Sequence, residues 1–334
     1  MKQSYYLFNP GRMSRQDNTL QFTPVDEHGV EGQTRYIPVE GVDNIYCFGS
    51  LDANSALYNF LGKNHVAVHF FDYYEYYTGS FMPKDYLLAG KMQVEQTRHH
   101  LSDKKRLVLA RKLVEGAAFN MQKNLSYYQN RGKDVSSMLA RIEGYTQLIE
   151  SAQRIDELMG IEGNIRQTYY EAFGVIINDF QMGNRTKQPP QNEVNALVSF
   201  GNMLCYAVCL DQIYHTQLNP TISFLHEPGA RRYSLALDIA EIFKPILVDR
   251  TIFSVLNKKQ IQASDFRQDL NRCLLKDSAR KTFVKAFEDH LKETFKHRSL
   301  GRHVSYKHLI KLECYKLCKH LLGTDEYKPF RMLW

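Results

Sequence analysis

The 334-residue sequence has few cysteines and no long apolar run. Its six cysteines form no C-x-x-C pair, so the sequence indicates neither a zinc site nor a redox pair. Cys205/Cys209 and Cys314/Cys318 are each spaced for one helical face among apolar residues, and we expect them in the core as reduced thiols. No apolar run approaches the roughly 20 residues of a membrane span, and the first residues show no charged-then-apolar leader. We therefore expect a cytoplasmic protein with no membrane association.

The sequence also lacks the motifs of common nucleotide-binding proteins. It contains no P-loop, no Rossmann glycine pattern and no His-Asp dipeptide. These absences argue against an ATPase-like nucleotidase and against an HD phosphohydrolase. The composition, 43% hydrophobic and 24% charged, is that of a soluble globular protein. With 334 residues the chain is longer than a domain with a single hydrophobic core usually is, so two domains are expected.

Charge is unevenly distributed along the chain. The formal net charge is +7, but residues 1–90 carry 6 basic and 10 acidic side chains, a net charge of −4. The rest of the chain therefore carries +11. This segregation predicts that the second part binds a polyanion, although a basic surface that meets only solvent would give the same count.

The first part of the sequence predicts β-structure. Short apolar or alternating runs are separated by turn residues, as in a small sandwich. One helix interrupts them before Gly62, which suits the position after a helix end. The tyrosines of 73–77 could stack on bases or cover a small sheet. The runs are Tyr5–Phe8, Thr19–Thr23, Arg35–Val39, Asn44–Phe48 and Val66–Phe71.

Glycine, serine and proline make Thr78–Pro83 the best candidate for the start of a linker. Beyond Lys91, apolar residues recur at the three-and-four spacing of helices. We therefore predict an α+β multidomain protein, in which a small N-terminal β-sandwich domain precedes a larger all-α domain. The predicted boundaries are 1–83 for the β-sandwich, 84–90 for the linker and 91–334 for the helical domain.

The segment Phe224–Pro245 sets a histidine in a turn directly before an acidic helix. His226 is the candidate imidazole ligand, and Ser234 is the expected N-cap of the helix. Asp238 and Glu241 lie three residues apart, so their carboxylates repel unless a cation lies between them. That cation could be a divalent metal ion. It could equally be an arginine, for which Arg231 and Arg232 are the nearest candidates in the sequence.

A third ligand could come from either of two similar tripeptides, which contain Glu143 and Glu162. Carboxylates with one imidazole form a mixed site that suits Mn²⁺ and tolerates Mg²⁺. Such an ion can polarise a phosphodiester, align a hydroxyl and stabilise the departing oxygen. The loop Gly183–Pro190 carries Arg185 and Lys187, which could contact phosphate or simply be solvated.

Five segments together resemble the Cas-one family, the CRISPR-associated adaptation integrases/endonucleases. The resemblance covers essentially the whole chain and is strongest after Gly160. The segment that follows Glu162 carries Arg166 and then two tyrosines, in the order of the family motif, which favours Glu162 over Glu143. The segments are Met159–Tyr170, Asn195–Gly201, Phe224–His226, Ser234–Arg250 and Leu312–Leu322.

The resemblance implies a DNA endonuclease and integrase of prokaryotic antiviral defence. Members insert prespacer DNA into a CRISPR array when its 3′-hydroxyl attacks a phosphodiester, and they nick branched DNA. By this resemblance Glu162, His226 and Glu241 bind Mn²⁺ or Mg²⁺, and Asp238 is an adjacent catalytic acid. Many relatives have aspartate where this chain has Glu241. The implied contacts to double-stranded DNA are Arg166, Arg185, Lys187, Tyr206, Arg231 and Arg232.

The resemblance also implies a homodimer formed through the β-sandwich, and a small ferredoxin-fold partner of the Cas-two family. Around Tyr206 the residues differ from the usual family pattern. Two alternatives stay open from the sequence. One is a structure-specific nuclease of branched DNA repair intermediates, which an adjacent repeat array in the genome would argue against. The other is a non-catalytic DNA-architectural protein, which the intact acidic residues argue against.

Overall fold

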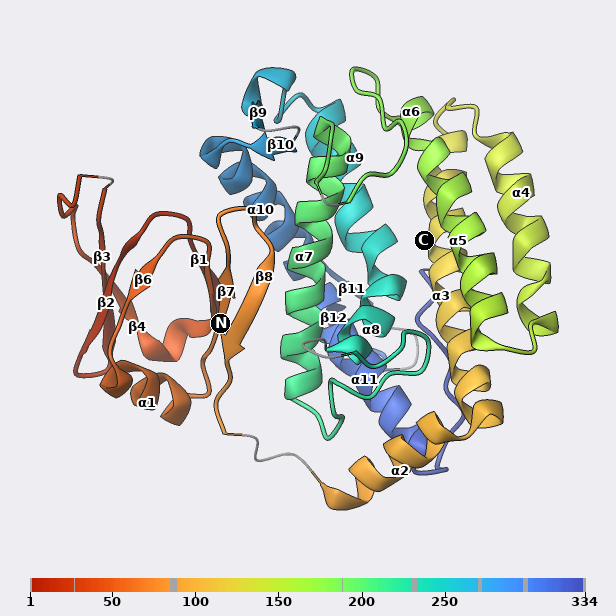
Figure 1. The fold of residues 1–334 in the computed structure, drawn as a ribbon, viewed down its shortest axis with the longest axis horizontal. Helices are drawn as coiled ribbons and strands as arrows, with labels where there is room; N and C mark the ends of the chain where they lie inside the picture. Colours follow the sequence, from red (N-terminus) through yellow and green to blue (C-terminus); the bar gives the residue numbers. More distant parts are fainter. Residues whose placement is uncertain are drawn as a thin grey trace. The chain divides into compact units, whose positions relative to one another are not determined.

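The computed structural model describes residues 2–26, 28–84, 89–187, 189–229, 233–269, 272–296 and 300–332. The chain divides into two compact units, Met1–Tyr86 and Leu87–Trp334. The first unit is rich in strands and the second in helices (Figure 1). This division of secondary structure confirms the predicted α+β fold class.

The first unit is a sandwich of two four-stranded sheets. In one sheet β1 and β7 both pair in parallel with β5, and β8 is antiparallel to β7. Its strands are β1 (Gln3–Leu7), β5 (Val42–Cys47), β7 (Ala67–Phe71) and β8 (Tyr77–Phe81). The other sheet contains β4 (Arg35–Pro38), β3 (Thr19–Pro24), β2 (Gly11–Gln16) and β6 (Leu51–Asp52), and the helix α1 (Ser55–Lys63) follows β6.

The alternation of apolar residues in these strands places one set of side chains in a common core. Leu20 of β3, Ile45 of β5 and Val68 of β7 are each at most 1% exposed and belong to this core. Burial of such side chains contributes about 1.5–3 kcal/mol each to the free energy of unfolding. The predicted runs therefore form strands because their alternation matches the two faces of a sheet.

Two sequence predictions in this unit are wrong in detail. Composition suggested a linker at Thr78–Pro83, but Thr78–Phe81 belongs to strand β8, where Gly79 lies opposite Phe70; this strand lies inside the predicted β-sandwich range 1–83. The serine that suggested a loop, Ser80, instead bonds His69 Nδ1 at 2.7 Å. The left-handed backbone after α1 falls on His65 (φ +58°), and Gly62 remains inside the helix. Of the predicted linker, 84–90, residues 85–88 lie outside the described residues.

The second unit is mainly helical, but two hairpins depart from the all-α prediction for 91–334. They pair β9 (Phe266–Asp269) with β10 (Arg272–Leu275), and β11 (Thr294–Lys296) with β12 (His303–Ser305). Strands of three or four residues are too short to show a periodicity. The helices are α2 (Gly90–Leu101), α3 (Asp103–Gln129), α4 (Ser136–Gln147), α5 (Ile155–Glu171), α6 (Phe173–Ile176), α7 (Glu193–Tyr214), α8 (Ser234–Lys244), α9 (Arg250–Asn257), α10 (Asp277–Lys292) and α11 (Tyr306–Leu321).

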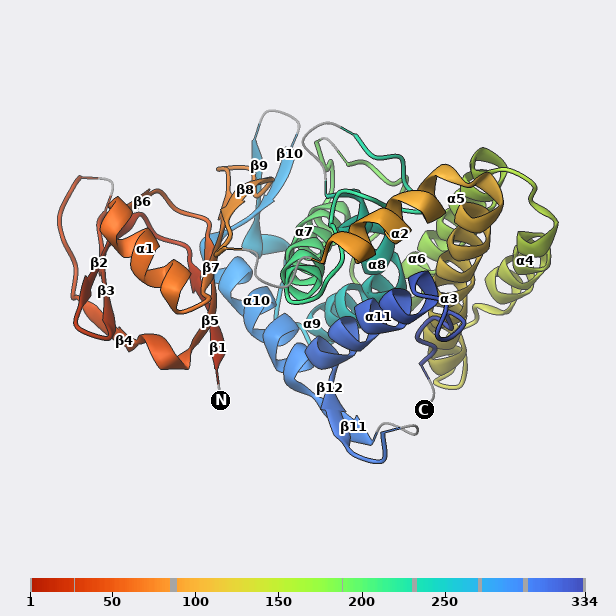
Figure 2. The ribbon, with the colours of Figure 1, turned by 90° about the horizontal axis from the view of Figure 1, so that it is seen from below.

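Helix α7 is the core of this unit and packs against α8, α9, α11 and β10 (Figures 1 and 2). It is the one helix in the described part of the chain that is long and apolar enough to span a membrane, but 78% of its apolar window is buried. Such burial is typical of a core helix. All six cysteines are buried free thiols, as predicted for those of α7 and α11.

A π-helical segment, Pro245–Asp249, joins α8 to α9. It passes so close to α7 that a Cβ on Gly201 would lie 2.4 Å from Val248 Cγ1. Only glycine permits this approach. Helices α3, α4 and α5 form a neighbouring layer, and α3 also contacts α8 (Figure 1). Helices α5 and α8, which carry Glu162, Asp238 and Glu241, therefore both pack on α3.

Candidate functional site

Arg166 joins the two glutamates that the sequence singled out. Glu162 and Arg166 lie one turn apart on α5, and Arg166 Nε donates to Glu162 Oε1 at 2.6 Å. A second guanidinium nitrogen of Arg166 donates to Glu241 Oε2 on α8. An arginine thus lies between the carboxylates. It comes from α5, whereas Arg231 and Arg232, the candidates nearest in sequence, lie outside the described residues.

Glu241 has a second cationic partner. Lys244 Nζ donates to Glu241 Oε1 at 2.7 Å, and Glu241 is only 6% exposed. Burial alone would raise the pKa of Glu241, but the charges of Arg166, Lys244 and His226 outweigh it and hold that pKa at about 2. Glu241 is therefore a carboxylate throughout the neutral range.

Asp238 faces a different set of partners from Glu241. It is fully buried, and its Oδ2 accepts from the backbone amides of Phe224 at 2.6 Å and Leu225 at 3.0 Å. Its Oδ1 accepts from the backbone amide of His226 at 3.0 Å and from His226 Nδ1 at 2.8 Å. The spacing of Asp238 and Glu241 suggested a shared acidic face. In the structure, Asp238 instead holds the histidine turn.

The bond to Asp238 fixes the tautomer of His226. A carboxylate only accepts, so Nδ1 of His226 carries a proton, and the neutral ring keeps its lone pair on Nε2. Burial lowers the pKa of His226, but the hydrogen bond and charge of Asp238, with the charge of Glu241, outweigh it and raise that pKa. A histidine oriented by a carboxylate in this way is the usual form of a metal-binding imidazole.

Ser234 is not the N-cap that the sequence predicted. It is the first residue of α8, Tyr233 holds the cap position, and the buried Ser234 hydroxyl donates to the Thr221 carbonyl at 2.8 Å. The Tyr233 amide donates to the hydroxyl of Tyr206 on α7 at 3.3 Å. These two contacts attach the start of α8 to the loop that leads to His226 and to α7, which places Tyr206 beside that start.

The loop before α7 contributes two basic residues. Arg185 donates to Asn195 Oδ1 at 3.1 Å and to Ser199 Oγ at 3.0 Å, and burial lowers its pKa. Lys187 is exposed, and its pKa is lowered by partial burial and then by the charges of Arg185, Lys244 and Arg166. Arg185 therefore anchors the loop on α7, and Lys187 lies within electrostatic range of Glu241.

A buried acid that the sequence analysis did not single out lies behind the glutamates. Asp249, at the end of the π-helical segment, is 2% exposed, and burial raises its pKa to about 7 against the charge of Arg166 and a hydrogen bond with Tyr169. Asn124 of α3 donates to the Tyr169 hydroxyl at 3.0 Å. The sequence signal that could have identified Asp249 is its position as a single acidic residue directly after the apolar run Ile246–Val248.

Glu143, the competing third ligand, lies elsewhere. It is exposed on α4, whereas Glu162 shares Arg166 with Glu241. Among the residues that the structure describes, no group of three or more His, Cys, Asp or Glu side chains is close enough to hold a metal ion. The donor types of Glu162, His226 and Glu241 nevertheless suit Mn²⁺ or Mg²⁺, and His226 is already oriented. In this arrangement Arg166 occupies one oxygen of each glutamate, and Lys244 occupies the other oxygen of Glu241.

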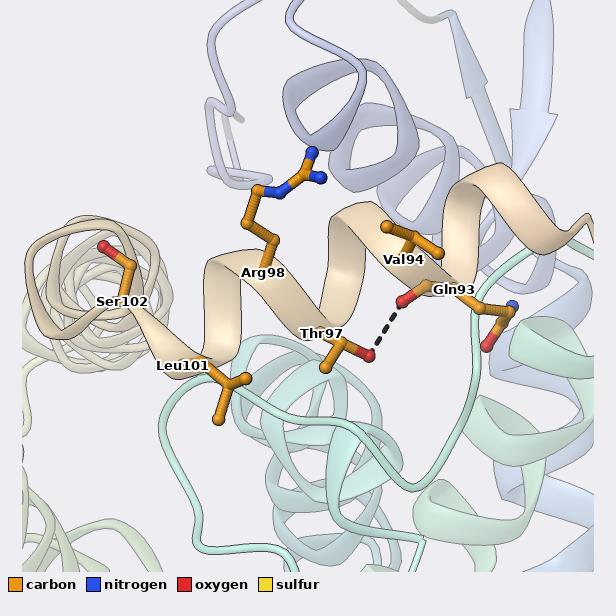
Figure 3. Close-up of a pocket in the computed structure, with 6 residues that line it drawn as sticks. All are labelled: Gln93, Val94, Thr97, Arg98, Leu101 and Ser102. Atoms are coloured by element: carbon orange, nitrogen blue, oxygen red, sulfur yellow. Dashed lines mark hydrogen bonds between the residues drawn. The ribbon is translucent and has the colours of Figure 1, made fainter.

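A separate hollow of about 530 Å³ lies along α2 (Figure 3). None of the four acidic or histidine candidates is among its described lining residues, which are Gln93, Val94, Thr97, Arg98, Leu101 and Ser102. The hollow is therefore lined by residues other than Glu162, His226, Asp238 and Glu241.

Comparison with known proteins gives consistent matches over the full chain. A family model described as "CRISPR associated protein Cas1" matches residues 5–289. The chain is 44% identical to the CRISPR-associated endonuclease Cas1 of Fusobacterium nucleatum over 100% of this chain and 98% of that protein. It is 46% identical to CRISPR-associated protein Cas1 1 of Methanobrevibacter ruminantium over 100% and 99% of the two chains.

Solved structures agree with this result. A CAS1 protein from Thermotoga maritima superposes with a TM-score of 0.86 at 38% identity, over 97% of this chain and 98% of that chain. A casposase bound to an integration product also gives a TM-score of 0.86, at 20% identity over 100% and 95% of the two chains. The second likeness, at this low identity, shows a shared fold.

Proposed function

The chain belongs to the CRISPR-associated Cas1 family, and we propose that it integrates prespacer DNA into a CRISPR array by metal-dependent transesterification. Two observations support this proposal: Arg166 joins Glu162 of α5 to Glu241 of α8, and His226, oriented by Asp238, lies within electrostatic range of Glu241. The same site would also nick branched DNA, with water in place of the attacking hydroxyl.

Glu162, Glu241 and Nε2 of His226 would hold Mn²⁺ or Mg²⁺. When bound, the ion would polarise the phosphodiester and stabilise charge on the departing oxygen. Glu241 is suited to this role because its pKa of about 2 keeps it ionised. Asp238 contributes as the residue that holds the histidine turn and orients the ring.

The reaction exchanges one phosphodiester for another. The 3′-oxygen of the prespacer forms a bond to phosphorus, the bond from phosphorus to the 3′-oxygen of the repeat strand breaks, and the proton passes from the attacking to the departing hydroxyl. Arg166 could bind the phosphate of the substrate, because a guanidinium forms hydrogen bonds with phosphate oxygens as well as with carboxylates. Its release from the glutamates would thus bring a cation to the substrate.

Double-stranded and branched DNA are the proposed substrates. The net charge of +11 beyond residue 90 favours binding to phosphates, which is sequence-independent and sensitive to salt. Lys187 is the exposed basic residue in range of the site, and Arg185 holds its loop. Tyr206 would contact DNA beside the start of α8, and Arg231 and Arg232 remain candidates by sequence.

We further propose that the protein acts as a cytoplasmic homodimer that associates through its β-sandwich unit. A small Cas2-type protein of ferredoxin fold is the proposed partner. Support comes from structural neighbours described as Cas6-RT-Cas1–Cas2 complexes, which share the fold at 17% identity. Sedimentation of the full chain tests the dimer, and a concentration-independent monomer would contradict it.

The central experiment compares integration of a labelled prespacer by wild type, Glu162→Ala and Glu143→Ala in Mn²⁺. We expect Glu162→Ala to lower the strand-transfer rate by orders of magnitude while the protein stays folded and binds DNA. Glu143→Ala should remain near wild type, because Glu143 is exposed on α4. Loss of activity in Glu143→Ala with retention in Glu162→Ala would refute the site. Nicking without strand transfer would instead favour a repair nuclease.

A further inference from the structure

The turn that carries His226 is held from two sides. On one side Asp238 of α8 accepts from three consecutive amides, those of Phe224, Leu225 and His226. On the other side, side chains of α2 and α3 bind the carbonyls that precede His226. The second set of contacts plays no part in the site described above.

Helix α2 binds the loop upstream of the turn. Gln96 is fully buried, and its amide donates to the carbonyls of Asn219 at 2.9 Å and Ile222 at 2.7 Å. His100 Nδ1 lies 2.7 Å from the Ser223 carbonyl, to which it donates because a carbonyl only accepts. Figure 3 shows the loop passing beneath α2.

Arg106 of α3 continues this series and reaches both ends of the turn. Its Nε donates to the Phe224 carbonyl at 2.9 Å, and its Nη2 donates to Glu227 Oε1 at 2.6 Å. Arg106 is 9% exposed and the Phe224 carbonyl belongs to a fully buried residue. The contacts of Arg106 therefore lie on both sides of His226, at Phe224 two residues before it and at Glu227 directly after it.

The two contacts of Arg106 are unequal. The Glu227 side chain is 73% exposed, so its ion pair is screened by solvent and weak. The bond to the Phe224 carbonyl is buried, and its loss leaves a buried acceptor without this donor. Positioning of the turn therefore depends mainly on the guanidinium and the backbone, and much less on the charge of Glu227.

We propose that Arg106 is a positioning residue, which fixes His226 by holding the backbone of its turn from α3. The inference rests on the proposed role of His226 in strand transfer. Displacement of a reacting group by about 1 Å costs as much as 10²-fold in rate, so a loosened turn lowers kcat even when DNA still binds. Arg106 acts through the turn and touches no reacting atom.

The test uses the full chain with Arg106→Met, Arg106→Lys, Glu227→Gln and the control Arg111→Met. Arg111 is also a largely buried arginine of α3 that donates to a backbone carbonyl, that of Ala152, but it does not contact the turn. The readouts are the melting temperature, DNA affinity, kcat and KM for strand transfer, and the proton resonance of His226 Nδ1–H. His226→Ala assigns that resonance by its absence.

We expect Arg106→Met to broaden or lose the Nδ1–H resonance and to lower kcat at least about tenfold, with DNA affinity within about twofold of wild type. Arg106→Lys keeps the charge but has a single donor nitrogen in place of the two that Arg106 uses, and it should lie between Arg106→Met and wild type in both readouts. Glu227→Gln and Arg111→Met should keep the resonance and kcat, even where Arg111→Met melts at a lower temperature.

A wild-type resonance and kcat in Arg106→Met overturn the proposal, as does an equal loss of kcat in Arg111→Met. If Arg106→Met does not fold, Arg106→Lys decides, and full kcat with a sharp resonance in that variant overturns it. If His226→Ala still carries out strand transfer, the proposed function is refuted. The His226 Nδ1–H resonance then remains the test of whether Arg106 positions the turn. If His226→Ala loses strand transfer but Arg106→Met has no effect, only the positioning role of Arg106 is refuted.

Discussion

Glu162 and Glu241, far apart in the sequence, share one guanidinium. Arg166 donates to both, and its 2.6 Å bond to Glu162 runs along α5 while the other crosses to α8. Without it, the buried Glu241 and the partly buried Glu162 would repel each other and resist removal from water. Arg166 is therefore the counter-charge that the two glutamates share, and Lys244 is a second one for Glu241 alone.

Arg166→Met should lower the free energy of unfolding of the metal-free protein by about 3–5 kcal/mol, because it leaves Glu162 without its cation and Glu241 with Lys244 alone. Saturating Mn²⁺ should recover part of this loss by linkage. Urea denaturation with EDTA or Mn²⁺ measures both effects. Arg141→Met is the control, since Arg141 pairs with Glu171 at the surface and such pairs contribute at most about 1 kcal/mol. An equal loss in the two variants would contradict the prediction.

Asp238→Asn should remove more than charge. The carboxylate accepts four hydrogen bonds, from three backbone amides and the His226 ring. In asparagine one carboxylate oxygen is replaced by an NH₂ group, which cannot accept, so at least one of these N–H groups loses its acceptor. We expect a loss of about 3–5 kcal/mol and loss of strand transfer. Thermal melting and the integration assay test this. Asp156→Asn, at an exposed position, should be near neutral, and a wild-type melting temperature for Asp238→Asn would be inconsistent with the structure.

Asp249 should make the metal-free protein less stable as the pH rises. Its folded-state pKa of about 7 lies above the ordinary value of 3.8, so between these values the folded state holds a proton that the unfolded state has lost. The free energy of unfolding then falls by at most about 1.4 kcal/mol per pH unit in that window. Asp249→Asn should match wild type near pH 4 and exceed it near pH 7.5. Parallel curves for the two proteins would rule out this assignment.

Two glycine substitutions should act in opposite directions. Gly201→Ala places a Cβ 2.4 Å from Val248 Cγ1 and should cost about 1–3 kcal/mol. Gly144→Ala lies on α4 with no heavy atom within 4 Å of the new Cβ, and it should stabilise the protein by about 0.5–1 kcal/mol. Chemical denaturation of both variants measures the difference. Stabilisation by Gly201→Ala would contradict the close approach of α7 to the π-helical segment.

The sequence predicted what depends on local pattern. Alternation identified the strands that carry Leu20, Ile45 and Val68, and spacing identified the helix with Asp238 and Glu241. It did not predict which partner each acid would take, because the amides that bind Asp238 belong to a turn placed by tertiary packing. Ser80 was misassigned for the same reason, since its hydroxyl is satisfied by a neighbouring strand.

The parallel pairing of β1 with β5 sets an order of events during synthesis. Gln3–Leu7 pairs with Val42–Cys47, so the first strand leaves the ribosome long before its partner. At ordinary translation rates the delay is roughly two to eight seconds. The hairpin of β2 and β3 is local and closes within about 1–10 μs of its emergence. The second sheet of the sandwich therefore begins to form first, and β1 stays exposed to chaperones until β5 arrives.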